Sequence, residues 1–78
     1  FMNPVPVMRL VEVIRGARTS EATVKRCTEL AAAMGQVCTT AADMPGFIAN
    51  RLLMPYINEA VFALWEGTGT RDHIDTTM

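Results

Sequence analysis

The chain lacks an excess of positive charge and has few aromatic residues. Its 78 residues include seven lysines and arginines against eight acidic residues, which gives a net charge of −1, and 6% are aromatic. Nucleic-acid-binding proteins usually present a basic patch together with aromatic side chains on which bases stack. We therefore expect no nucleic-acid partner.

Cysteine and histidine are also scarce. Cys27 and Cys38 are the two cysteines, and His73 is the one histidine. This spacing fits neither a zinc site nor a redox motif, so we expect no metal and two reduced, buried thiols, as is typical of an intracellular protein. We expect His73 on the surface, because its protonated ring would oppose the dipole of the helix predicted around it.

The longest apolar stretch, residues 46–65, is not uninterrupted. Asn50, Arg51, Asn58 and Glu59 lie within it, and such residues are costly in a membrane-spanning helix. The N-terminal residues contain prolines and no basic segment, unlike a signal peptide. We therefore expect no membrane partner.

The composition is apolar for so short a chain. Half of the residues are hydrophobic, although a domain of this size buries only about 60% of its unfolded surface. The excess predicts apolar surfaces that face other parts of a larger protein. The alternative is a tightly packed small domain, but no disulfide or metal that would stabilise one is evident.

The first half of the chain has the pattern of strand, helix and strand. Residues 9–14 are predicted to be a buried strand, and residues 36–41 are a second one that is rich in β-branched side chains. Between them, Thr19 or Ser20 can cap a helix that Gly35 ends. This order predicts the edge of an α/β sheet, with parallel strands if the helix crosses over.

The second half is predicted to be helical. Residues 43–46 form a turn and the best domain boundary, and a helix is expected over residues 46–66, ended by Gly67. Thr70 can cap a further helix. Pro55 is expected to kink the long helix.

Glu12 is the first candidate for chemistry. It shares a strand face with Leu10 and Ile14, so its carboxylate needs a cationic or hydrogen-bonding partner to offset desolvation. One interpretation is an edge-strand glutamate that reaches water. The other is a carboxylate that orients a histidine and stabilises its charged form, as a general acid/base requires.

Asn50 is the second candidate. On a helix over residues 46–66 it turns about 100° away from the polar face that contains Arg51, and lies beside Phe47 and Met54. A buried amide must be hydrogen-bonded. It is either bonded to the backbone or is a donor that points into a cleft.

The segments over residues 1–14 and 43–55 together resemble the 3-hydroxyacyl-CoA dehydrogenase family, and the similarity extends over essentially the whole chain. The resemblance implies an α/β Rossmann-domain edge, of two strands and a helix, joined to the start of an all-α C-terminal domain. Residues 1–43 would end the NAD-binding Rossmann domain. Residues 44–78 would begin the helical domain for dimerisation and substrate enclosure.

The resemblance also implies roles for single residues. The family's general acid/base is a histidine followed by Phe-x-Asn-Pro, which matches Phe1, Asn3 and Pro4, so the histidine would directly precede Phe1 and Asn3 would lie near the active site. Glu12 matches the catalytic glutamate that partners this histidine. Asn50 matches the asparagine that contacts the acyl-CoA oxygen near the reacting carbon. The glycine-rich loop for NAD would lie upstream, so the 78 residues alone are expected to be inactive.

The function that this resemblance implies is NAD-dependent interconversion of 3-hydroxyacyl-CoA and 3-ketoacyl-CoA in fatty-acid or butanoate metabolism. The partners would be an acyl-CoA substrate and a second copy of the chain, bound through the C-terminal helices. The location would be the cytoplasm of a bacterium, or a peroxisome or mitochondrion of a eukaryote. Two alternatives are a helical oligomerisation module without catalysis and a related two-domain hydroxy-acid dehydrogenase.

Overall fold

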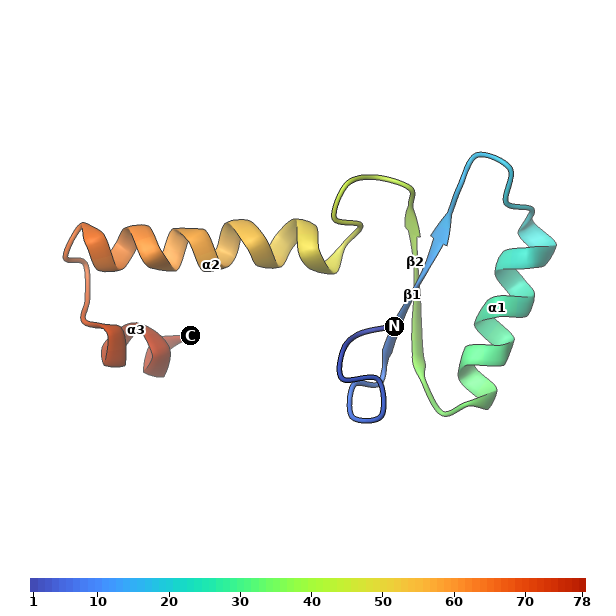
Figure 1. Ribbon diagram of the computed structural model, residues 1–78, viewed down its shortest axis with the longest axis horizontal. Coiled ribbons are helices and arrows are strands. Elements are labelled where there is room, and N and C mark those ends of the chain that lie inside the picture. The colour runs from blue at the N-terminus through green and yellow to red at the C-terminus, as the bar shows by residue number, and fades with distance from the viewer. The chain divides into compact units, whose positions relative to one another are not determined.

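Residues 1–78 are described by a computed structural model with two strands and three helices (Figure 1). In chain order the elements are β1 (Leu10–Arg15), α1 (Glu21–Ala33), β2 (Val37–Ala42), α2 (Ala49–Trp65) and α3 (Arg71–Thr77). The chain divides into two compact units, Phe1–Ile48 and Ala49–Met78. The first unit therefore contains both strands and α1, and the second contains α2 and α3.

The first unit is built on a parallel pair of strands. β1 and β2 pair in register from Leu10 opposite Val37 to Arg15 opposite Ala42. Parallel neighbours need a crossover connection, and α1 provides it and packs against both strands (Figure 1). The predicted order of strand, helix and strand, with parallel pairing, is confirmed. Each strand begins and ends one residue later than predicted.

The ends of α1 follow from local side-chain chemistry. The Ser20 side chain accepts a hydrogen bond from the Thr23 amide at 3.1 Å, which satisfies one of the unpaired donors of the first turn. At the other end, Met34 is the C-cap and Gly35 has a φ of 76°, a left-handed conformation that glycine adopts without steric cost. Both predicted signals therefore act as expected.

Two ion pairs lie on the surface near α1. Glu21, in the first turn of α1, pairs with Arg15 at the end of β1. Lys25 contacts Glu29 at 3.8 Å. All four side chains are exposed, so these pairs contribute little to stability.

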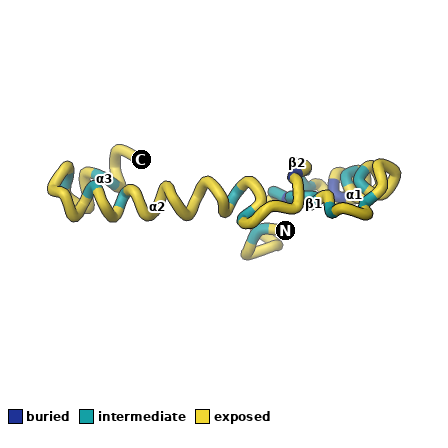
Figure 2. The backbone as a smooth tube through the Cα atoms, turned by 90° about the horizontal axis from the view of Figure 1, so that it is seen from above, coloured by how far each residue is buried: buried dark blue, intermediate teal, exposed yellow.

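The core of the first unit is small. Its buried apolar residues are Val11, Ala31 and Ala41, and Figure 2 shows buried positions only on this unit. Both cysteines are free, as predicted, but Cys27 is exposed and Cys38 is half-buried. The prediction of buried thiols was therefore wrong, because α1 buries only Ala31 and β2 buries only Ala41.

The long helix α2 begins three residues later than predicted. A hydrogen bond from the Phe47 amide to the Met44 carbonyl, at 2.9 Å, closes a turn ahead of it. Gly46 and Phe47 have φ values of 82° and 50°, which no right-handed helix can include. The helix continues through Pro55.

Glycine and threonine define the end of the second unit as predicted. Gly67, with a φ of 77°, follows the end of α2. The Thr70 hydroxyl then accepts a hydrogen bond from the His73 amide at 3.3 Å and caps α3. Neither α2 nor α3 has a buried residue.

Large apolar side chains are exposed on α2. They include Leu52, Leu53, Met54, Tyr56, Ile57, Val61, Phe62, Leu64 and Trp65, of which Trp65 is 79% exposed. Apart from the polar stripe that contains Arg51, Asn58 and Glu59, the surface of α2 is apolar. So wide an apolar surface is typical of a helix that packs against further elements, which agrees with the excess of apolar residues in the sequence. None of the helices is long and apolar enough to cross a membrane.

Removal of the α1 cap should be measurable. We expect Ser20→Ala to lower the free energy of unfolding of the intact protein by about 1 kcal/mol, because the Thr23 amide loses its acceptor. The matched control, Ser20→Asp, keeps an acceptor and should remain close to wild type in urea unfolding. Equal midpoints for the two variants would contradict the capping role.

Candidate functional site

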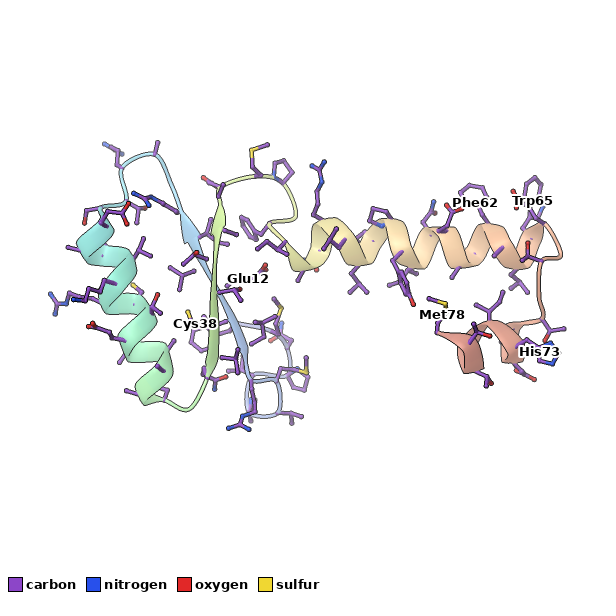
Figure 3. All side chains as sticks on the ribbon, turned by 180° about the vertical axis from the view of Figure 1, so that it is seen from behind. Glu12, Cys38, Phe62, Trp65, His73 and Met78 are labelled. Atoms are coloured by element: carbon purple, nitrogen blue, oxygen red, sulfur yellow. The ribbon has the colours of Figure 1, made fainter.

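Glu12 lies in the middle of β1, where it is half-buried (Figure 3). It is opposite Thr39 of β2 in the parallel register. The alternation of side chains along a strand places it on the same face as Leu10 and Ile14. Glu12 therefore lies among aliphatic neighbours on the strand, as predicted.

The carboxylate of Glu12 has a backbone partner. Its Oε1 accepts a hydrogen bond from the Ile48 amide at 3.1 Å. Ionised acceptors form stronger hydrogen bonds than neutral ones, so this bond offsets part of the cost of removing the carboxylate from water. The requirement for a partner was predicted correctly, but the partner was missed, because a backbone amide 36 residues away leaves no signal in the side chains.

The Ile48 amide is positioned by a tight turn that follows β2. The Met44 amide bonds to the Ala42 carbonyl at 2.8 Å, and the Phe47 amide bonds back to Met44 at 2.9 Å. Two consecutive left-handed residues, Gly46 and Phe47, then direct the chain into Ile48. Glycine adopts this region freely, whereas a bulky residue such as phenylalanine does so only where its surroundings impose it.

The arrangement allows Glu12 to serve a second donor. An ionised carboxylate has two oxygens and about four lone-pair sites, so it can accept several hydrogen bonds at once. The bond from Ile48 restricts how the carboxylate rotates without using its whole capacity. A carboxylate held in this way can orient a donor such as an imidazole ring and stabilise its positive charge.

Asn50 occupies the first turn of α2, in the second unit, and its side chain is exposed. Phe47, which was expected beside it on the helix, lies outside the helix in the left-handed turn. The expectation of a buried amide was therefore wrong for this chain, because no residue of α2 is buried.

Asn3 and His73 are the remaining residues that the sequence analysis considered. Asn3 is exposed in the N-terminal segment, ahead of a cis peptide bond to Pro4. His73 is exposed on α3, as predicted (Figure 3). No group of three or more His, Cys, Asp or Glu residues is arranged to hold a metal ion.

A hollow in the second unit lies between α2 and α3. Its volume is about 390 Å³, and apolar residues such as Ala60, Ala63 and Ile74 line much of it. None of the candidates Glu12, Asn50 and Asn3 lines it. It therefore adds nothing to the chemistry expected of those residues.

Comparison with protein families gives two matches that follow one another along the chain. The first is the NAD binding domain of 3-hydroxyacyl-CoA dehydrogenase, which matches residues 1–44. The second is the C-terminal domain of 3-hydroxyacyl-CoA dehydrogenase, which matches residues 46–78. Together they cover nearly the whole chain.

Individual relatives agree with these matches. The chain is 51% identical over all 78 residues to a probable 3-hydroxybutyryl-CoA dehydrogenase of Bacillus subtilis, and covers 27% of that protein. It is 45% identical over 78 residues to the human mitochondrial hydroxyacyl-coenzyme A dehydrogenase, and covers 25% of it. The chain thus spans about a quarter of the length of these relatives.

A solved structure supports the fold. The crystal structure of (S)-3-hydroxybutyryl-CoA dehydrogenase from Ralstonia eutropha matches with a TM-score of 0.85 and 45% identity, over 94% of this chain and 26% of that one. The predicted fold class is therefore confirmed: a parallel Rossmann edge is followed by the start of a helical domain. On both sequence and structure, the chain belongs to the 3-hydroxyacyl-CoA dehydrogenase family.

Proposed function

We propose that these 78 residues are part of an NAD-dependent 3-hydroxyacyl-CoA dehydrogenase, which interconverts 3-hydroxyacyl-CoA and 3-ketoacyl-CoA. The observation that carries the proposal is the ordered match to both domains of this family, at 51% identity to one relative. Within this proposal, residues 1–43 end the NAD-binding domain and residues 44–78 begin the helical domain.

The chain's own residues do not hold the phosphates of NAD. Its glycines are Gly16, Gly35, Gly46, Gly67 and Gly69, and none of them forms the Gly-x-Gly-x-x-Gly pattern of a dinucleotide-binding loop. In the proposed reaction, NAD accepts the hydride from carbon 3 of the hydroxyacyl group. The part of this chain is to position the groups that handle the hydroxyl proton and the substrate.

Glu12 is proposed to orient the general base. The resemblance described above implies a histidine directly before Phe1, which would take the proton of the 3-hydroxyl group. Glu12 would accept a hydrogen bond from that imidazole and stabilise the imidazolium that forms. The bond from Ile48, at 3.1 Å, supports this role, because it restricts the carboxylate to a defined orientation.

Asn50 is proposed to bind the acyl-CoA oxygen near the reacting carbon. Its exposed side chain on the first turn of α2 supports this role, since an amide there is accessible to a ligand. Fixing the substrate in this way would help to align carbon 3 for hydride transfer. Asn3, in the Phe-x-Asn-Pro segment, is proposed to lie near the same reacting centre.

The proposed partners are an acyl-CoA substrate and a second copy of the protein. The apolar surface of α2, with residues such as Leu52, Phe62 and Trp65 exposed, supports a homodimer formed through the helical domain. Its relatives include bacterial proteins and proteins named as mitochondrial. We propose the bacterial cytoplasm or the mitochondrion as the location.

The role of Glu12 is tested by Glu12→Gln in the intact enzyme. Glutamine retains an oxygen that can accept from Ile48 but cannot stabilise an imidazolium by charge, so kcat should fall by about 100-fold or more with little change in KM. Glu29→Gln, an exposed site on α1, is the control and should leave both constants unchanged. A near-normal kcat for Glu12→Gln would remove Glu12 from the mechanism.

The role of Asn50 is tested by Asn50→Ala. We expect kcat/KM for acyl-CoA to fall by about 10- to 100-fold through loss of a substrate hydrogen bond, whereas KM for NAD should stay within about twofold. Asn58→Ala, an exposed amide on the same helix, is the matched control. If the two variants behave alike, Asn50 has no special contact with the substrate.

The proposed location of the NAD site is tested by calorimetry on the 78 residues. We expect no binding at micromolar NAD, whereas the intact enzyme should bind, because the phosphate-binding glycines are absent from this chain. Circular dichroism confirms that the helices are present under the same conditions. Micromolar binding to the 78 residues would contradict the proposed location.

A further inference from the structure

We propose that the turn over residues 43–48 is the positioning element for Glu12, and that it acts through the Ile48 amide. This inference rests on the proposed function, since it assumes that the orientation of Glu12 matters for the reaction. It adds a group that the family resemblance does not name. The group is a backbone donor, which no substitution at Ile48 short of proline would remove.

The Ile48 amide donates to the Oε1 oxygen of Glu12. The Ile48 amide lies 3.1 Å from Oε1 of Glu12, across 36 residues of sequence. A glutamate side chain has several rotatable bonds, and on an exposed strand it would sample many rotamers. A donor fixed by the backbone selects the rotamers in which the carboxylate lies close to the turn.

The turn contains a residue in a conformation that its side chain disfavours. Phe47 has a φ of 50°, and the residue before it, Gly46, has a φ of 82°. In a left-handed conformation, the Cβ of a residue other than glycine lies too close to the following carbonyl oxygen. The bond from the Phe47 amide to the Met44 carbonyl, at 2.9 Å, closes the same turn. The result of this geometry is an amide that faces the middle of β1.

The test uses Gly46→Ala in the intact enzyme. Alanine at a φ of 82° strains the turn, so the Ile48 amide should lose its alignment with Glu12. We expect kcat to fall by about tenfold, with KM for both substrates within about twofold. We also expect amide hydrogen exchange in residues 43–48 to become at least about tenfold faster.

Two control variants separate positioning from general destabilisation. Gly35→Ala places the same strain at a φ of 76°, where an added Cβ meets nothing within 4 Å, and should lower thermal stability to a similar extent without lowering kcat. Gly46→Asn should recover most of the kcat, because asparagine tolerates the left-handed region better than alanine. If Gly35→Ala lowers kcat as much as Gly46→Ala, the inference is overturned.

A double-mutant cycle then shows whether the turn acts through Glu12. In a Glu12→Ala background, Gly46→Ala should have no further effect on kcat, because the group that it positions is gone. A full additional tenfold loss would overturn the inference while leaving the role of Glu12 intact. A normal kcat for Glu12→Ala alone would overturn the proposed role of Glu12, and the positioning inference with it.

Discussion

The hydrogen bond between the Glu12 carboxylate and the Ile48 amide is the interaction around which the candidate site is built. It joins the middle of β1 to a turn that follows β2, at 3.1 Å. A carboxylate that shares a strand face with leucine and isoleucine is unfavourable unless donors compensate for lost water. The Ile48 amide is such a donor, and the turn that contains it ends the first compact unit. The same bond therefore offsets part of the lost hydration of a half-buried carboxylate and restricts its orientation.

The rest of the first unit is held together by few interactions of its own. Its buried apolar residues are a valine and two alanines. The free energy gained by burying these small side chains is low in comparison with the conformational entropy cost of ordering a chain of this length. The parallel strand pair also lacks further neighbours, and two strands are marginal by themselves. A family in which this segment makes up about a quarter of the protein accounts for both features.

Local chemistry made much of the fold predictable. The Ser20 and Thr70 caps, together with the left-handed glycines at positions 35 and 67, were read from residue type and spacing and are present in the structure. The start of α2 was not predictable in this way. Phe47 adopts a left-handed conformation that its side chain disfavours. The residue type at this position therefore favoured a helix that already includes Phe47.

The candidate site shows the same division between local and long-range information. The position of Glu12 on the strand followed from alternation along residues 9–14, but its partner is a backbone group from a distant turn. The burial of Asn50 was inferred from its apolar neighbours on the helix, but its side chain is exposed, as no residue of α2 is buried. The resemblance to the family, rather than burial, is the reason for proposing Asn50 as a substrate ligand.

The backbone bond alone does not explain why position 12 carries a full charge. A neutral acceptor such as glutamine could accept from Ile48 at a lower desolvation cost, because neutral polar groups lose less hydration energy than ions do. A carboxylate between Leu10 and Ile14 is therefore more expensive than the turn requires. The additional cost is explained if the charge also stabilises a cation during the reaction, and a protonated histidine is such a cation. The turn would then explain the position of the side chain, and stabilisation of the protonated histidine would explain why the residue is a glutamate and not a glutamine.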